Sequence, residues 1–345
     1  MKKKQTILLA LTTVMFASCA SDSSEIVKSP PEPIMLGTAM QVETRGNSQT
    51  LQATELEAGQ TVGVYIYYTG ETEKTGTYGY ENIAYTVSGT AGDLALVNSA
   101  HQPYYPEQKN QNVDVYAFAP RVYTGTAALN TLTAQDVFTT ASDQTTNANY
   151  LASDFVWGKT ATAVTYATAT AGAIEIPLKH KLSKVNINIA PGTGMTLDKL
   201  AHARITLHGV VLQGTVDFTT GTVTTKTGAA ASTVVLTSEA STTTTTSFST
   251  GTPAVSYTAC TSSAVIIPQS IAASTSTTPF ITVELWDGTS AYTSAYKVNT
   301  TAATTFAAEK VYTYNIIVNT HGLSLMTTIT DWDATGLSPV DVIAE

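Results

Sequence analysis

The side chains that most often carry chemistry are few and scattered in this sequence. None of the five histidines has a metal-binding spacing: His202 and His208 are six residues apart, on one face of a strand but too distant to share an ion. Asp331 and Asp333 in "DWD" bring two carboxylates together, but a catalytic pair also needs a cleft and a third group. We interpret them as the end of a strand. Because phosphate-binding, dinucleotide-binding and serine-nucleophile motifs are absent from the sequence, we expect neither an enzyme nor a metal or cofactor.

Aromatic side chains suggest a different chemistry, the binding of sugars. Trp286 in "ELWDG" and the pair Tyr104 and Tyr105 in "QPYYPE" could stack on sugar rings, although such residues more often pack at the rim or in the core of a β-sandwich. The formal net charge is −9 and no basic stripe exists, so we expect no nucleic-acid partner.

The first residues have the pattern of an export signal. "MKKKQTILLALTTVMFASC" has three lysines, then an apolar run too short to span a membrane, then small residues before Cys19. "FASC" resembles the lipobox of bacterial lipoproteins, in which the cysteine is acylated and cleavage occurs just before it. We expect a signal peptide at 1–18 and a lipid on Cys19, which would hold the protein at the outer membrane. An ordinary secretory signal with an incidental cysteine is the alternative.

A Pro-rich leader follows, and it ends near an arginine. Pro30, Pro31 and Pro33 keep this part extended, and exposed extended chain is where proteases cut. "VETRG" offers a trypsin-like enzyme Arg45 with the flexible Gly46 after it. The alternative is that Arg45 is simply a solvated surface residue.

Short alternating runs of apolar and polar residues dominate the chain after residue 60. Only 12% of the residues are charged, and the abundance of Thr, Val and Tyr suits strands better than solvated helices. The apolar residues of 61–68 alternate with tyrosines, which predicts a strand with one wet face. "TTGT" at 219–222 joins two such runs and predicts a hairpin turn. Two stretches are candidates for short helices: 129–138 and 196–203.

Regular spacing of short strands predicts an all-β fold class. We expect two tandem antiparallel β-sandwich domains, transthyretin-like or Greek-key, with short helical turns in the loops. Gly and Pro gather in "APGTGMT" at 190–196, which is the predicted domain boundary.

Several segments, taken in their order along the chain, resemble those of fimbrillins, the subunits of type V pili. They are the lipobox, the leader ending in Arg–Gly, "KHKLSKVNINI" at 179–189 and "KVYTYNIIV…LSLMTTITDWD" at 310–333. The resemblance implies a lipoprotein precursor at the cell surface whose leader is removed by an arginine-specific, trypsin-like protease. A strand from another subunit then fills the groove that the leader leaves, and the subunits polymerise head-to-tail.

On this resemblance the cleaved bond is Arg45–Gly46 and the C-terminal tail, about 320–345, is the donor. The partners are other copies of the chain, the tip and anchor subunits of the pilus, the protease and, through Cys19, the outer membrane before cleavage. The expected segments are a signal peptide at 1–18, a leader at 19–45, and sandwich domains at 46–190 and 191–345. The donor-strand residues expected for assembly are Leu323, Leu325, Thr327, Ile329, Trp332, Leu337, Val340 and Val342.

Four functional interpretations differ in what they require. A shaft subunit must own a strand to donate, and the alternating tail favours this role in a fimbria used for adhesion or biofilm formation. An anchor would keep its lipid, and a tip subunit would carry an extra binding region. A surface-exposed lipoprotein that binds glycans would present Trp286 or Tyr104 on a flat platform.

Overall fold

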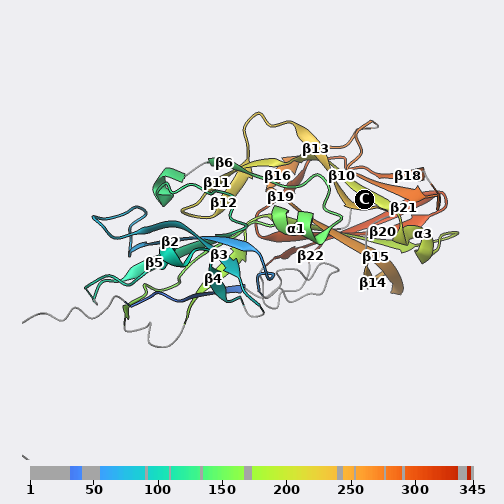
Figure 1. Cartoon of the computed structure of the whole chain (residues 1–345). Coiled ribbons are helices and arrows are strands. Elements are labelled where there is room, and N and C mark those ends of the chain that lie inside the picture. The colour runs from blue at the N-terminus through green and yellow to red at the C-terminus, as the bar shows by residue number, and fades with distance from the viewer. Residues whose placement is uncertain are drawn as a thin grey trace, which may run out of the picture. The chain divides into compact units, whose positions relative to one another are not determined.

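β-strands form most of the described chain, with only short helices between them (Figure 1), and the prediction of an all-β fold is confirmed. The computed structural model describes residues 32–40, 55–89, 92–108, 110–132, 135–166, 173–238, 244–251, 254–275, 277–289, 292–332 and 340–342.

The N-terminal sheet has seven strands in the order β1-β8-β7-β5-β2-β3-β4. Its neighbouring strands pair antiparallel except β1 and β8, which are parallel. One face of this sheet encloses an apolar core built by inward-facing Val, Ile, Leu and Ala side chains. The strands are β1 (Leu36–Met40), β2 (Thr61–Tyr68), β3 (Tyr80–Val87), β4 (Leu94–Leu96), β5 (Val113–Ala119), β7 (Val156–Lys159) and β8 (Ile174–His180).

The C-terminal part contains a sandwich of two sheets. A six-stranded sheet has the order β14-β15-β9-β20-β21-β22, and a four-stranded sheet has the order β13-β10-β17-β18. Side chains from β9, β15 and β20 pack against those from β10, β13 and β17 to make the second core. The strands are β9 (Ser183–Pro191), β10 (Arg204–Val211), β13 (Ala231–Thr237), β14 (Thr244–Thr250), β15 (Val255–Ile266), β17 (Ile281–Trp286), β18 (Tyr292–Val298), β20 (Lys310–Asn319), β21 (Gly322–Asp331) and β22 (Val340–Val342).

Small sheets and short helices complete the fold. A three-stranded sheet has the order β12-β11-β6, and β16 pairs with β19. The predicted turn at 219–222 is confirmed: β11 and β12 form a hairpin in which Gly221 has φ +74°. The remaining elements are β6 (Gln135–Thr139), β11 (Gln213–Asp217), β12 (Thr222–Thr225), β16 (Gln269–Ile271), β19 (Thr304–Phe306), α1 (Asn147–Ser153), α3 (Leu197–Ala201), η1 (Ser99–His101) and η2 (Leu129–Leu132).

Two expectations about local structure need correction. Of the helix candidates, 196–203 contains α3, but 129–138 holds a 3-10 turn followed by strand β6, because β6 finds backbone partners on β11. Strand β2 has no wet face: its aliphatic side chains enter the N-terminal core, whereas Tyr65 and Tyr67 enter a third core with Phe118.

The third core lies where the N-terminal sheet meets the rest of the fold. It collects aromatic residues of β2 and β5, residues of β6, β11 and β12, and Leu182, Val265, Val311 and Trp332. The predicted boundary near residue 190 falls at the end of β9, whose ladder partners β15 and β20 come from later in the chain. Residues Glu32–Glu345 belong to one compact unit. Within the described residues, no helix is long and apolar enough to cross a membrane.

Candidate functional site

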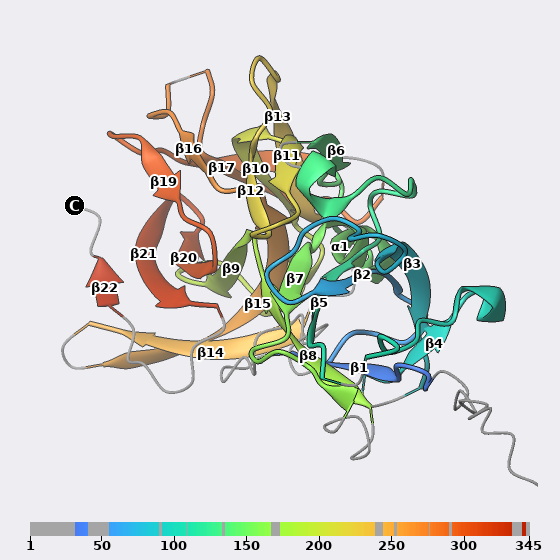
Figure 2. The same ribbon diagram turned by 90° about the vertical axis from the view of Figure 1, so that its left-hand side faces the viewer.

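Strand β1 belongs to the predicted leader, and it is an edge strand of the N-terminal sheet. It pairs in parallel with β8 over five positions, from Leu36 opposite Ile174 to Met40 opposite Leu178. Figure 2 shows β1 lying between β8 and β4, which are the neighbours of its two sides. The leader therefore contributes backbone to the folded protein instead of lying outside it.

The other side of the leader binds the chain around β4 and η1. The Ile34 N–H donates to the Pro103 carbonyl at 2.8 Å, and the Tyr105 N–H donates to the Glu32 carbonyl at 3.0 Å. Gly37 forms an antiparallel bridge with Asp93. Because β1 bonds to β8 on one side and to these segments beside β4 on the other, both of its backbone edges are bonded although it is the terminal strand of the seven-stranded sheet.

Alternate side chains of the leader fill the N-terminal core. Ile34, Leu36 and Met40 are 1%, 4% and 5% exposed and belong to the core cluster, whereas Met35, on the opposite face, is 57% exposed. Three buried side chains of this size contribute about 5–9 kcal/mol of gross hydrophobic stabilisation. Removing β1 would expose the part of this core that these three side chains cover.

Gly92 lets the leader approach closely. It has φ +70°, and a Cβ added there would overlap the carbonyl oxygen of Thr38 in β1. The Thr38 N–H and its hydroxyl both donate to the Gly92 carbonyl, at 2.9 and 3.0 Å. We call the segments that bond to the leader, strand β8 and residues 92–105, its seat. Gly92 suits this position because it has neither a side chain nor a steric barrier to positive φ.

The pKa of Tyr105 depends in part on the bound leader. Tyr105 is buried beside the leader and packs against Tyr166, with ring centroids 6.0 Å apart. Burial, and secondarily the carboxylate of Glu32, raise the pKa of Tyr105 to about 12. Part of this shift depends on the leader, because Glu32 is a leader residue.

The predicted donor strand is paired within its own chain in this form. β21 pairs with β20 over ten positions, with Leu325 opposite Ile316 and Ile329 opposite Tyr312. Leu323, Leu325 and Ile329 are partly buried against the C-terminal core. β22 adds a short outer ladder in which Val340 lies opposite Ile329 and Val342 opposite Thr327 (Figure 2).

The end of β21 and the seat strand β8 share a buried contact. Trp332 follows β21 and stacks on His180, the last residue of β8, with ring centroids 4.0 Å apart and an interplanar angle of 6°. His180 Nδ1 lies 2.9 Å from Asp154 Oδ1, and both side chains are almost fully buried. A chain of direct contacts thus runs from the leader through β8 to the C-terminal strands.

Several predicted residues lie outside the described part of the chain: Cys19, Arg45, Gly46, Leu337 and Asp333. Lipidation and cleavage therefore stay predictions. Neither β8 nor Gly92, which hold β1 in place, was predicted as part of the site. The only local signal was the alternation of Ile34, Leu36 and Met40, which identifies a strand but not its partner more than 130 residues away.

The alternative chemistries find limited support in the geometry. Trp286 is half-buried and packs on Tyr292, with ring centroids 5.0 Å apart, and Tyr104 is half-buried where it bridges to Pro33. In the described part of the chain, no group of three or more His, Cys, Asp or Glu side chains is placed to hold a metal ion.

Comparisons with known proteins agree with the fold. A family model described as fimbrillin-like matches residues 44–332. A solved structure from Bacteroides ovatus, provisionally described as a cell adhesion protein, is 18% identical, covers 89% of this chain and 100% of its own, and superposes with a TM-score of 0.61. A second, from Bacteroides uniformis and described in the same way, is 20% identical, covers 86% and 99%, and gives a TM-score of 0.54. The search of curated proteins found no match.

Proposed function

The chain belongs to the fimbrillin-like family, and on that basis we propose that it is a structural subunit of a cell-surface fimbria that serves adhesion. The subunit is exported as a lipoprotein precursor, loses its leader by cleavage of the Arg45–Gly46 bond, and polymerises head-to-tail by strand exchange. Its partners are other copies of the chain and the other subunits of the fimbria.

The observation that carries this proposal is the position of β1 ahead of Arg45. Residues 41–54 are the covalent connection between β1 and the rest of the domain. A cut in this connection leaves β1 held by non-covalent contacts: backbone hydrogen bonds, side-chain hydrogen bonds such as that of Thr38, and the buried Ile34, Leu36 and Met40 side chains. A strand of another subunit with the same alternation can then replace it.

The precursor is inactive in assembly because its own leader occupies the seat. Replacement creates a contact between two different surfaces, one at the seat and one at the C-terminal tail. Such a heterologous contact does not close on itself, so repetition produces a filament.

The C-terminal tail detaches from its own sheet beginning with the outermost strand, β22. β22 is bound to β21 over three positions, whereas β21 is bound to β20 over ten. The end of the tail, with Val340 and Val342, is therefore the part that moves at the smallest cost. The residues of β21 from Leu323 to Ile329 follow only if the gain in the new seat exceeds the loss in the old one.

Export and cleavage determine when the subunit becomes able to polymerise. The lipid on Cys19 holds the precursor at the outer membrane, since each buried CH₂ contributes about 0.8 kcal/mol. An arginine-specific, trypsin-like protease then releases the subunit from both lipid and leader. The alternating tail supports a shaft role over an anchor role, which would require the lipid to stay.

A cleavage experiment tests this function. An arginine-specific protease is applied to the purified precursor, to Arg45→Ala and to Lys28→Ala, a basic leader control. We expect the wild type and Lys28→Ala to yield a chain that begins at Gly46 and forms SDS-resistant oligomers, and Arg45→Ala to stay intact and monomeric. Polymerisation of Arg45→Ala at the wild-type rate would disprove the maturation step.

A truncation after Trp332 tests the donor separately. It removes β22 but keeps the β21 side chains that pack on the C-terminal core. We expect the truncated subunit to fold and to be cleaved, but to stay monomeric. Normal assembly of this variant would show that β22 is not needed as part of the donor strand.

A further inference from the structure

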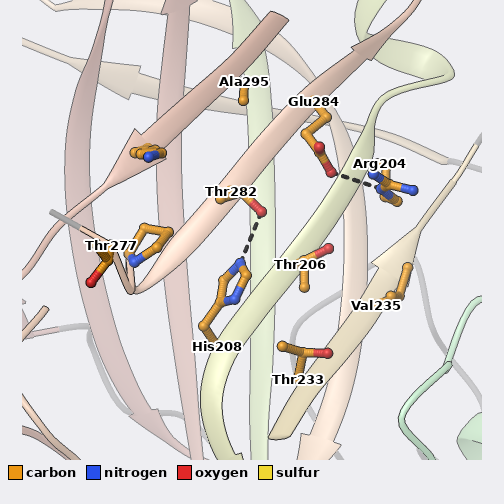
Figure 3. Close-up of a pocket in the computed structure, with 11 residues that line it drawn as sticks. Arg204, Thr206, His208, Thr233, Val235, Thr277, Thr282, Glu284 and Ala295 are labelled. Carbon is orange, nitrogen blue, oxygen red and sulfur yellow. Dashed lines mark hydrogen bonds and ion pairs between the residues drawn. The ribbon is translucent and has the colours of Figure 1, made fainter. Parts of the chain in front are cut away.

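The outward face of the four-stranded sheet contains a hollow of about 430 Å³ (Figure 3). It arises from strict alternation: Ile205 and Leu207 of β10 enter the C-terminal core, so Arg204, Thr206 and His208 face outward. β13, β17 and β18 contribute their own outward residues to the same hollow. It lies on a different sheet from both the leader seat and the C-terminal tail.

The shape of the hollow follows from side-chain length. Its middle is lined by the short side chains of Thr206 and Thr282, which are 7% and 8% exposed. Longer side chains, Arg204, Glu284 and Lys297, also line it. A ligand resting there would meet hydroxyl groups below and charged groups around it.

The charge of the lining differs from that of the whole protein. Arg204 and Lys297 bring two positive charges and Glu284 one negative charge, whereas the complete chain has a net charge of −9. An anion is therefore attracted to this position on a protein that otherwise repels it.

The arginine is held in place before any ligand arrives. Arg204 Nε donates to Glu284 Oε2 at 2.7 Å, and the guanidinium carbon lies 4.2 Å from the centre of the Tyr292 ring. A planar guanidinium fixed on one edge and one face loses little rotamer freedom when it binds a further oxyanion.

A histidine and an aromatic pair adjoin the charged groups. His208 Nε2 lies 3.0 Å from the Thr282 hydroxyl, and burial lowers the pKa of His208 against the smaller opposing effect of Glu284. The imidazole lines the hollow, so it can meet a ligand there. Tyr292 and the neighbouring Trp286 are half-buried, and Tyr292 supports the guanidinium of Arg204 from outside the lining of the hollow.

We propose that this hollow binds an anionic sugar residue, one that bears a carboxylate or a sulfate group. Arg204 and Lys297 receive the anion, Thr206 and His208 bond to sugar hydroxyls, and Pro279 and Ala295, which also line the hollow, contact an apolar face of the sugar. Trp286, the candidate for stacking on sugars, packs against Tyr292 and does not line the hollow.

The test measures binding of defined polysaccharides to the uncut full chain, so it does not depend on polymerisation. The probes are hyaluronan (carboxylate only), dextran sulfate (sulfate only) and unmodified dextran (neutral), measured by calorimetry at low salt. The variants are Arg204→Gln and Lys297→Gln, with Lys199→Gln on α3 as the charge-matched control. Thermal unfolding of each variant checks that the sheet is intact.

We expect at least one anionic probe to bind and neutral dextran not to bind. Lys297→Gln and Arg204→Gln each weaken that binding about tenfold, as loss of one charge-assisted hydrogen bond predicts, and Lys199→Gln leaves it unchanged. Hyaluronan alone would identify carboxylated sugars, and dextran sulfate alone would identify sulfated ones. Absence of binding to both anions, or equal losses in Lys199→Gln and Lys297→Gln, would overturn the proposal. Because Arg204 also contacts Glu284, the exposed Lys297 decides the outcome if Arg204→Gln unfolds.

Discussion

Replacement of Gly92 by alanine tests directly whether the leader is a removable strand with a fitted seat. Gly92 and Gly89 share a φ of +70°, but a Cβ at Gly92 meets the Thr38 carbonyl of β1, whereas a Cβ at Gly89 meets nothing within 4 Å. Gly89→Ala is therefore a matched control: both variants carry the same backbone strain, about 1–2 kcal/mol, and only one disturbs the leader.

The size of the effect follows from the bonds at this contact. To make room for a Cβ, Thr38 must move away and lose its two hydrogen bonds to the Gly92 carbonyl. Each bond has a net value of about 0.5–1.5 kcal/mol, so the leader loses about 1–3 kcal/mol of its binding free energy. This corresponds to about 5- to 150-fold weaker retention of the leader in Gly92→Ala.

The assay follows the leader after the chain is cut. The purified protein is cleaved after Arg45, and an excess of a labelled synthetic peptide with the sequence of residues 32–45 is added. Size-exclusion chromatography then gives the rate at which label enters the protein fraction. We expect Gly92→Ala to exchange its leader faster than wild type by the factor above, and Gly89→Ala to exchange at the wild-type rate. Equal rates for the two variants would show that the seat does not hold the leader through this contact.

Three further outcomes follow from the same structure. Leu36→Ala should lower the free energy of unfolding of the uncut chain by about 2–5 kcal/mol in urea titrations, whereas Met35→Ala on the exposed face should change it little; equal effects would refute the inward orientation of Leu36. Trp332→Ala should cost about 3–5 kcal/mol in the same titration, and a near-neutral result would mean that the stacked contact does not stabilise the fold. The pKa of Tyr105 should fall from about 12 toward the ordinary value near 10 when the leader leaves. Because the bound state holds the Tyr105 proton more tightly, the leader binds with its full affinity below pH 10, and this affinity declines between pH 10 and 12. Ultraviolet titration of the cut protein, with and without the leader that contains Glu32, will detect the change in the pKa of Tyr105.

Local sequence patterns predicted the elements well where neighbouring residues decide the structure. The hairpin at 219–222 and the alternation of Leu323, Leu325 and Ile329 required only period-two patterns and a turn glycine. The pattern at 129–138 failed because a strand partner outside the segment overrides its helix propensity.

Long-range pairing limited what could be predicted of the candidate site. The five-residue strand 36–40 carries a recognisable alternation, but nothing in it specifies β8 as its partner or parallel as its direction. The same limit explains why the tyrosines of β2 were expected to face water: a second core can be recognised only once β6, β11 and β12 are folded against that face.

The double-sided pairing of β1 has a mechanical consequence. Its hydrogen bonds to β8 and to residues 92–105 run from strand to strand, and those to the parallel strand β8 are slanted. A pull along the strand axis therefore loads both rows of bonds together in shear, whereas a pull at one end across the sheet would break them one after another. The paired β1 strand therefore resists a pull along its own axis better than a pull at one end across the sheet.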